Sequence, residues 1–186
     1  MGLWIFLAVV VLLLVYAVGV YNRLVRLRAL VHEGFSGITV QLRRRADLVP
    51  NHVETVKGYA THERETLDQV TAHRTDAMNA GSVAATAQAD NAMTAMLGRL
   101  FAVAEAYPEL KADANFRELQ GELSSLETEL QSARRYYNAT ARDLNTRIFS
   151  FPDMLFATPM GFKEEPYYED ADPAIQSAPK VEFQRP

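Results

Sequence analysis

The first 21 residues carry no charged side chain, and this feature constrains the fold more than any other. Nineteen of these residues are apolar, and the first charge along the chain is Arg23. Residues 3–21 would extend roughly 28 Å as a helix at about 1.5 Å per residue, which matches a hydrocarbon core of about 30 Å. The stretch also lacks the polar face of a soluble surface helix. Residues 1–21 are therefore predicted to be a transmembrane anchor.

A cleavable signal peptide is the alternative interpretation of this segment. Signal peptides begin with a basic region and end in a cleavage site of small residues. No basic residue precedes this span, and residues 17–21 form a poor cleavage site, so we favour a permanent anchor. Arg23, Arg26 and Arg28 follow it directly. The positive-inside rule then predicts an N-terminus outside and the bulk of the chain in the cytoplasm.

The remaining chain has helical spacing of apolar residues throughout and no β-like alternation. We expect an all-α protein in which the transmembrane helix leads into a long antiparallel up-and-down four-helix bundle. The bundle is predicted over residues 22–151, with helices at about 22–49, 51–79, 82–107 and 112–151. Pro50 is expected to end the first of these, because a proline disfavours helical angles in the residue before it. The last helix has the clearest coiled-coil spacing, with one apolar residue in every seven: Phe116, Leu123, Leu130, Tyr137, Leu144 and Phe151.

Residues 152–186 form an acidic, proline-containing tail of different composition. From Asp153 onward the tail has seven acidic and three basic residues, and five prolines follow Pro152. This composition is typical of disorder. The tail nevertheless contains many large apolar residues, among them Phe156, Phe162 and Tyr168. We therefore expect part of it to pack on the bundle.

The chain shows no constellation typical of metal or covalent chemistry. It has no cysteine and a formal net charge of −4, which argue against a disulfide scaffold and a strongly basic nucleic-acid binder. Its four histidines are too scattered for a zinc site, so we expect no metal, no cofactor and no nucleic-acid partner. The run Gly34-Phe35-Ser36-Gly37 is one residue short of the Gly-x-Ser-x-Gly motif of a nucleophile elbow, so it does not indicate a catalytic serine. These glycines are expected to let another helix approach closely. The histidines are His32, His52, His62 and His73.

A polar cluster surrounds the predicted junction between the first two helices. We interpret it as an interhelical or interaction cluster, with the arginines pairing with acids of the last helix, Glu122, Glu127 and Glu129. A catalytic or regulatory role is the alternative, and it would require these side chains to face a cleft unpaired. Ligand sensing is a third possibility and would need a cavity lined by Met93, Met96 and Leu126. The cluster comprises Gln41, Arg44, Arg45, Asp47, Asn51, Glu54, Lys57 and His62.

Several motifs along the chain resemble those of the LemA family. They include Val49-Pro50-Asn51, Tyr107-Pro108, Tyr137-Asn138, Phe151-Pro152 and Gly161-Phe162-Lys163. Phe35 stands where that family usually carries tryptophan. The resemblance implies a bacterial single-pass membrane protein with a cytoplasmic-type helical bundle and no established enzyme activity. It also implies a link, by analogy, to magnetosome membranes and membrane metalloproteases.

These observations favour a non-enzymatic scaffold or adaptor in the bacterial inner membrane. We expect the lipid bilayer to be one partner, and a second copy of the chain or another membrane protein to be the other. Such a protein would serve membrane organisation or a membrane protease complex. The third predicted helix supports this expectation, because its alanine-rich surface carries Asp90 as its only charge before Arg99.

Overall fold

The computed structural model describes residues 1–59, 68–72 and 80–168. Its described residues form helices and connections with no strand, so the all-α class and the long apolar N-terminal helix are confirmed. The helices are α1 (Gly2–Tyr59), α3 (Val83–Glu105), α4 (Pro108–Ala112), α5 (Ala114–Phe149) and α6 (Met154–Ala157). Residues 68–72 are also helical.

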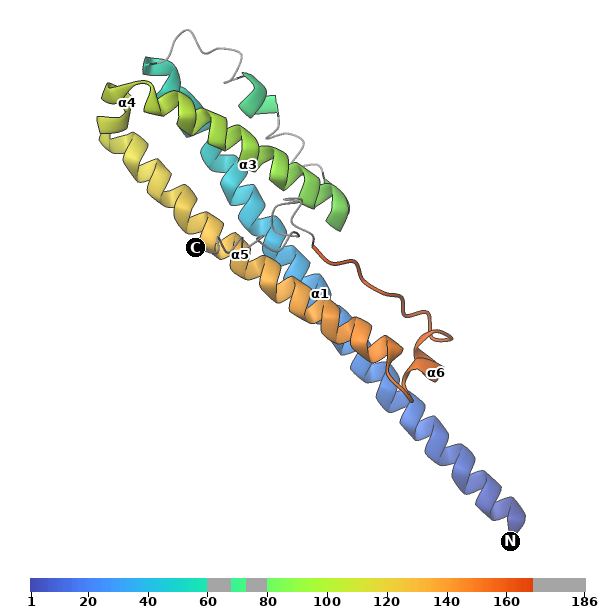
Figure 1. The fold of residues 1–186 in the computed structure, drawn as a ribbon. Helices are drawn as coiled ribbons and strands as arrows, with labels where there is room; N and C mark the ends of the chain where they lie inside the picture. The colour runs from blue at the N-terminus through green and yellow to red at the C-terminus, as the bar shows by residue number, and fades with distance from the viewer. Residues whose placement is uncertain (60–67, 73–79, 169–186) are drawn as a thin grey trace, which may run out of the picture.

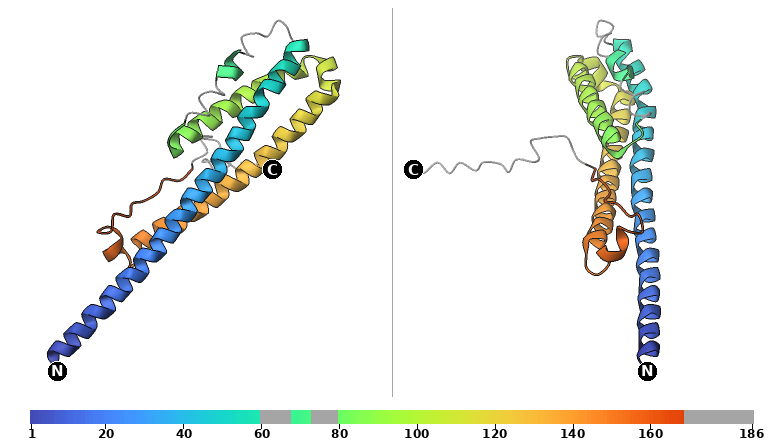
Figure 2. Two further views of the ribbon diagram at one scale, coloured as in Figure 1. Left: turned by 180° about the vertical axis from the view of Figure 1, so that it is seen from behind. Right: turned by 90° about the vertical axis from the view of Figure 1, so that its right-hand side faces the viewer.

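Helix α1 is both the predicted anchor and a central element of the core. Its 58 residues extend about 87 Å, and the N-terminal part projects beyond the rest of the molecule (Figures 1 and 2). Most of the apolar stretch is exposed, and it is long enough to cross a membrane. From Val20 onward, α1 buries a stripe with seven-residue spacing against the other helices. The fully or nearly buried members of this stripe include Leu24, Val31, Ile38, Leu42, Val49 and Val56.

The break predicted at Pro50 is wrong, because α1 continues through this proline to Tyr59. An interior proline loses one backbone hydrogen bond and crowds the preceding turn, at a cost of about 3 kcal/mol. Burial on both sides offsets that cost: Val49 is 1% exposed, and His52 and Val56 are fully buried. Tertiary packing therefore overrides the local preference.

Three long helices make up the described bundle. Helices α1 and α5 lie antiparallel along most of the length of α5, and α3 covers the end of the pair that is distant from the N-terminus (Figure 1). The predicted second helix falls largely outside the described residues, although Val70 within it is fully buried. Ser82 caps α3 by accepting a hydrogen bond from the Ala85 N–H at 3.2 Å. Asp113 caps α5 in the same way, through the Phe116 N–H at 2.9 Å.

Helix α5 approaches α1 closely at Gly34. A Cβ added there would lie 3.0 Å from the Tyr137 Cα and 3.4 Å from the Thr140 Oγ1. Gly37 faces open space instead. The expected close approach is therefore found at Gly34, whereas a Cβ added at Gly37 would meet no atom within 4 Å.

Candidate functional site

A buried charge network joins three helices and the C-terminal segment, and we call it the Asp90 network. It consists of Asp90 on α3, Arg45 on α1, Glu127 and Arg134 on α5, and Tyr168. Asp90 is fully buried, and Arg45 and Tyr168 are nearly so. The network holds two carboxylates and two guanidinium groups, so its formal charges cancel.

Asp90 receives hydrogen bonds from three directions. The Arg45 Nη1 lies 3.1 Å from one carboxylate oxygen. The Tyr168 hydroxyl donates to the other at 2.8 Å, and Arg134 pairs with that same oxygen. Glu127 completes the arrangement with ion-pair distances of 3.3 Å to Arg45 and 3.8 Å to Arg134. A buried carboxylate with this many charged and hydrogen-bonded partners remains compatible with a low-dielectric interior.

The surroundings of Arg134 and Tyr168 raise the pKa of both side chains, which keeps the arginine charged and the tyrosine neutral. Burial disfavours the charged form of Arg134, but the Asp90 carboxylate outweighs burial and raises the pKa of Arg134 above its ordinary value. Burial, reinforced by the Asp90 charge, raises the pKa of the Tyr168 hydroxyl well above its ordinary value. The Arg134 guanidinium also lies 5.5 Å from the centroid of the Tyr168 ring. The network thus favours a charged arginine stacked on a neutral tyrosine.

Tyr168 belongs to a non-helical segment, residues 158–168, which we call the strap. It turns over residues 158–161 and then runs along the bundle (Figure 1). Two asparagines of α5 each bind its backbone twice. Asn145 donates to the Glu165 carbonyl at 2.8 Å and accepts from the Glu165 N–H at 2.9 Å. Asn138 makes the same pair with Tyr168, at 3.0 and 2.8 Å. Each amide side chain therefore bonds the N–H and the carbonyl of one strap residue, as a neighbouring β-strand would. These bonds fix the position of the strap along α5.

The strap also buries its own apolar residues. Phe162 and Tyr168 are 5% exposed and join the core formed by α1 and α5. The Tyr137 hydroxyl donates to the Pro166 carbonyl at 2.7 Å, and burial raises the pKa of Tyr137 to about 12. Part of the acidic tail is therefore an integral element of the bundle.

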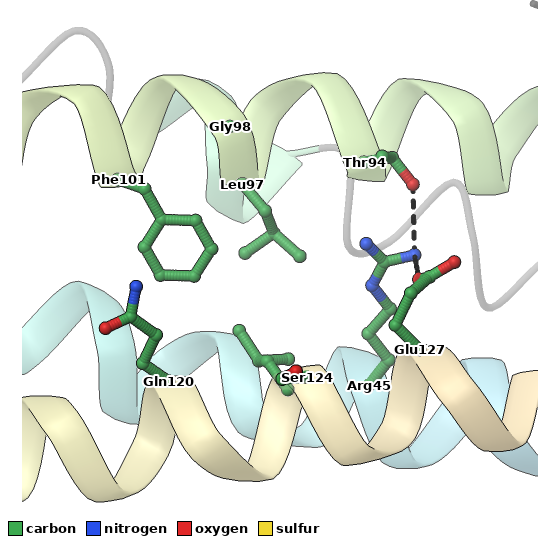
Figure 3. A pocket seen from close by; sticks show the side chains of 9 residues that line it. Arg45, Thr94, Leu97, Gly98, Phe101, Gln120, Ser124 and Glu127 are labelled. Atoms are coloured by element: carbon green, nitrogen blue, oxygen red, sulfur yellow. Dashed lines mark hydrogen bonds and ion pairs between the residues drawn. The ribbon is translucent and has the colours of Figure 1, made fainter.

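An apolar groove lies beside the Asp90 network, between α3 and α5. Figure 3 shows Leu97 and Phe101 of α3 facing Gln120 and Ser124 of α5, with Arg45 at one end. The groove has a volume of about 450 Å³. Arg45 reaches it through a hydrogen bond to the Thr94 Oγ1 at 3.0 Å. Chemically, the groove offers an apolar floor and one end occupied by paired charges.

A second hollow of about 340 Å³ lies between α1 and α5 and is lined by Leu126 among others. Met93 and Met96, in contrast, are buried in the core. The three residues proposed to line one sensing cavity therefore do not share one in the described structure. Two separate depressions take its place.

The residues of the predicted polar cluster are spread around α1. Arg45 alone enters the buried network. Arg44 is exposed, bonds Gln41 at 3.2 Å and pairs with Glu129 at 3.1 Å. In the structure, Arg44 pairs with Glu129 and Arg45 pairs with Glu127, so both ion pairs join α1 to α5.

The other members of that cluster lie nearer the end of α1. Lys57 and Glu54 are exposed and pair with each other at 3.4 Å, within one helix. Asn51 is exposed, and Asp47 lies on the wall of the second hollow. His62 lies outside the described residues. The members of the cluster that the structure describes are not gathered into one cleft.

Sequence reasoning missed Asp90, Arg134 and Tyr168 as members of a common site. One signal was available, because a single charge within an alanine-rich helix is costly unless it is paired. The partners could not be identified from spacing, since they lie 44 and 78 residues away. Their meeting depends on the register of α3 against α5 and on the path of the strap.

Metal-binding groups do not converge in the described part of the chain. Within it, no three His, Asp or Glu side chains are placed to hold one ion. His52 is buried and its Nδ1 lies 3.0 Å from the Leu48 carbonyl, one helical turn earlier. His32 is exposed, whereas His62 and His73 lie outside the described residues. Nothing in the arrangement of the described residues selects a cofactor.

These features define a class of all-α protein in which one helix combines an apolar, membrane-compatible stretch with the core of a helical bundle. The chain belongs to the LemA family, whose sequence model matches residues 34–183. It is 27% identical to "Protein LemA" of Metamycoplasma hominis, over 72% of this chain and 62% of that protein. It is 24% identical to "Magnetosome protein MamQ 2" of Paramagnetospirillum magneticum, over 81% of this chain and 65% of that protein.

"Magnetosome protein MamQ" of Magnetospirillum gryphiswaldense is similar to the same extent, at 24% identity over the same shares of the two chains. The chain thus spans somewhat less than two thirds of the length of these relatives. Their names specify no enzymatic activity. The resemblance read from the sequence motifs is confirmed by these matches.

Proposed function

We propose that this protein is a membrane-anchored helical scaffold that self-associates or docks a membrane partner. The observation that carries the proposal is the continuity of α1, which passes from the exposed apolar stretch into the buried core without a break. From Tyr21 to Tyr59, α1 extends about 57 Å. In a bundle built on this helix, the distal end is held at a defined distance from the proposed membrane span.

The arginines that follow the apolar stretch support an orientation. Arg23, Arg26 and Arg28 lie on α1 just beyond it, and basic residues flank a span on the cytoplasmic side. We therefore propose the inner membrane of a bacterium, with the N-terminus outside and the bundle in the cytoplasm. A reporter fused after Pro186 tests this: activity of a cytoplasm-dependent reporter supports it, and activity of a periplasm-dependent one contradicts it.

The names of the relatives are one ground for a proposed role in organising a membrane. The MamQ proteins are named for magnetosomes, and by analogy we propose such a role for this chain. The alternative catalytic interpretation of the polar cluster required unpaired side chains in a cleft. Arg44 and Lys57 instead have partners at 3.1 and 3.4 Å, which favours a structural role for that region.

Site-specific photo-crosslinking of the full-length protein in native membranes tests the scaffold function. A photoreactive side chain would replace Gly98 in the groove, Val40 on α1 or Arg135 on α5, all of which are exposed. We expect a discrete adduct at one or two of these sites, either with a second copy or with a single membrane protein. Absence of any discrete adduct at all three, with a freely diffusing monomer, would contradict the proposal.

A further inference from the structure

The turn between α5 and α6 exposes an unusual concentration of large apolar side chains. Phe149, Phe151, Met154 and Leu155 are 62, 78, 46 and 60% exposed. Residues 148–162 contain a single charged side chain, Asp153, and it is 1% exposed. Residues 149–155, which we call the apolar turn, therefore present an almost purely apolar surface.

Contacts with α1 fix where the apolar turn lies along that helix. The Tyr16 hydroxyl donates to the Asp153 Oδ1 at 2.6 Å, and the Tyr16 ring lies 5.7 Å from the Phe156 ring. Tyr16 is inside the uncharged stretch, five residues before Tyr21, which corresponds to about 7.5 Å. The apolar turn thus lies beside the exposed apolar part of α1, at the end of the bundle shown in Figure 1.

The charged side chains of this region pair with each other. Arg147 pairs with Asp153, so the single carboxylate of the turn is neutralised by its neighbour and by Tyr16. Just above, Phe162 packs against Tyr21 with ring centroids 5.8 Å apart and lies 5.1 Å from the Arg28 guanidinium. Along α1, the apolar turn comes first, the Tyr21–Phe162 pair follows, and Arg28 comes last. At a membrane surface, apolar residues lie in the hydrocarbon, aromatic residues at the headgroups and basic residues beyond them, in this same order.

We propose that the apolar turn enters the lipid bilayer beside α1 and forms a second membrane contact of this protein. Phe151 and Leu155 would contact acyl chains near the headgroup boundary, and the bundle would rest on the membrane rather than stand clear of it. The lipid is chosen as the occupant because the turn continues the exposed apolar surface of α1 at the same depth. An apolar patch of this kind marks an interaction site when it is exposed in a soluble setting. The inference rests on the proposed spanning role of α1.

The chain contains no cysteine, so single-cysteine variants of the full-length protein report on single positions. Phe151→Cys and Leu155→Cys would carry the environment-sensitive fluorophore NBD in vesicles of phosphatidylcholine and phosphatidylglycerol. Val40→Cys is the matched control, since Val40 is an apolar residue of α1, 53% exposed and about 28 Å beyond Tyr21. Val11→Cys reports on the span itself.

We expect probes at positions 151 and 155 to be quenched by nitroxide-labelled lipid and protected from aqueous iodide, each several-fold relative to position 40. Iodide quenching equal to that at position 40 would overturn the inference. Protection from iodide without lipid quenching would also overturn it, because a protein neighbour would then cover the turn. If position 11 is itself exposed to iodide, the proposed anchor fails; if position 11 is in lipid and positions 151 and 155 are not, only the inference fails.

Discussion

Removing the Asp90 carboxylate is the most direct test of how the bundle is held together. The substitution Asp90→Ala deletes the partner of two arginines and the acceptor of the Tyr168 hydroxyl. Of the two carboxylates of the Asp90 network, Glu127 would then remain for both Arg45 and Arg134. Breaking a buried ion pair on one side costs about 3–5 kcal/mol, because a buried charge is left uncompensated. The gain in helix propensity from aspartate to alanine, about 0.7 kcal/mol or less, does not offset this loss.

The expected loss is large enough to measure by thermal unfolding of the full-length protein in nanodiscs, followed by circular dichroism at 222 nm. For a chain of this size, each kcal/mol shifts Tm by about 2–4 °C, so we expect a decrease of roughly 6–20 °C. Glu129→Ala is the matched control. It also removes the carboxylate partner of an arginine, but the Arg44 and Glu129 side chains are 59 and 47% exposed. Exposed pairs contribute about 0–1 kcal/mol.

A second background separates charge compensation from packing. When Arg45 and Arg134 are both replaced by methionine, Asp90 itself becomes the uncompensated buried charge, so Asp90→Ala should no longer lower Tm and should instead raise it. Apolar replacement of a whole buried ion network is often neutral or stabilising. The reasoning is refuted if Asp90→Ala and Glu129→Ala shift Tm equally, or if Asp90→Ala still lowers Tm in the methionine background.

Four further outcomes are expected. Gly34→Ala should lower Tm, because its Cβ would meet the backbone of α5 at 3.0 Å, whereas Gly37→Ala, in open space, should raise stability by about 0.5–1 kcal/mol; equal effects would contradict the close approach. Pro50→Ala should raise Tm, since α1 is continuous there and an interior proline costs about 3 kcal/mol; a decrease would show that the proline is needed for packing. Asn145→Leu should increase hydrogen exchange in residues 162–168 because both hydrogen bonds to Glu165 are lost; unchanged protection would show that the side chain does not hold the strap. The pKa of Tyr168 is raised in the folded state. Its contribution to the free energy of unfolding is therefore complete below the pKa of an unfolded tyrosine, about 10, and decreases at higher pH. Tm measured against pH should show this decrease, and Tyr168→Phe should reduce it.

Periodicity predicted the helices well where one face of a helix meets one partner. In α5, the heptad positions from Phe116 to Leu144 are buried, but Phe151, the next in the series, is 78% exposed. The pattern continues in the sequence, yet α5 ends at Phe149 and the chain turns away. The seven-residue spacing of apolar residues predicts which face of a helix is buried, but it does not predict where the helix ends. The error at Pro50 has the opposite origin, because there a local stop signal was overridden by burial of its neighbours.

The candidate site was less accessible from the sequence because its members come from distant segments. Arg45 was identified within an arginine triplet, but nothing in that triplet distinguishes the buried Arg45 from the exposed Arg44. Their difference arises from a rotation of one residue, about 100°, around α1. The strap illustrates the same limit: its composition indicates disorder, and its order depends on two asparagines of α5 whose role appears only when the segments are side by side.

The continuity of α1 has a mechanical consequence. Membrane-spanning helices tilt by about 20° on average, and the tilt responds to bilayer thickness. With no flexible joint between Val20, which is already part of the core, and Tyr59, any tilt of the span is transmitted along roughly 57 Å of rigid helix. A tilt of about 20° displaces the distal end of the bundle sideways by about 20 Å. A change in the tilt of the proposed span would therefore move the distal end of the bundle farther than the end near the membrane.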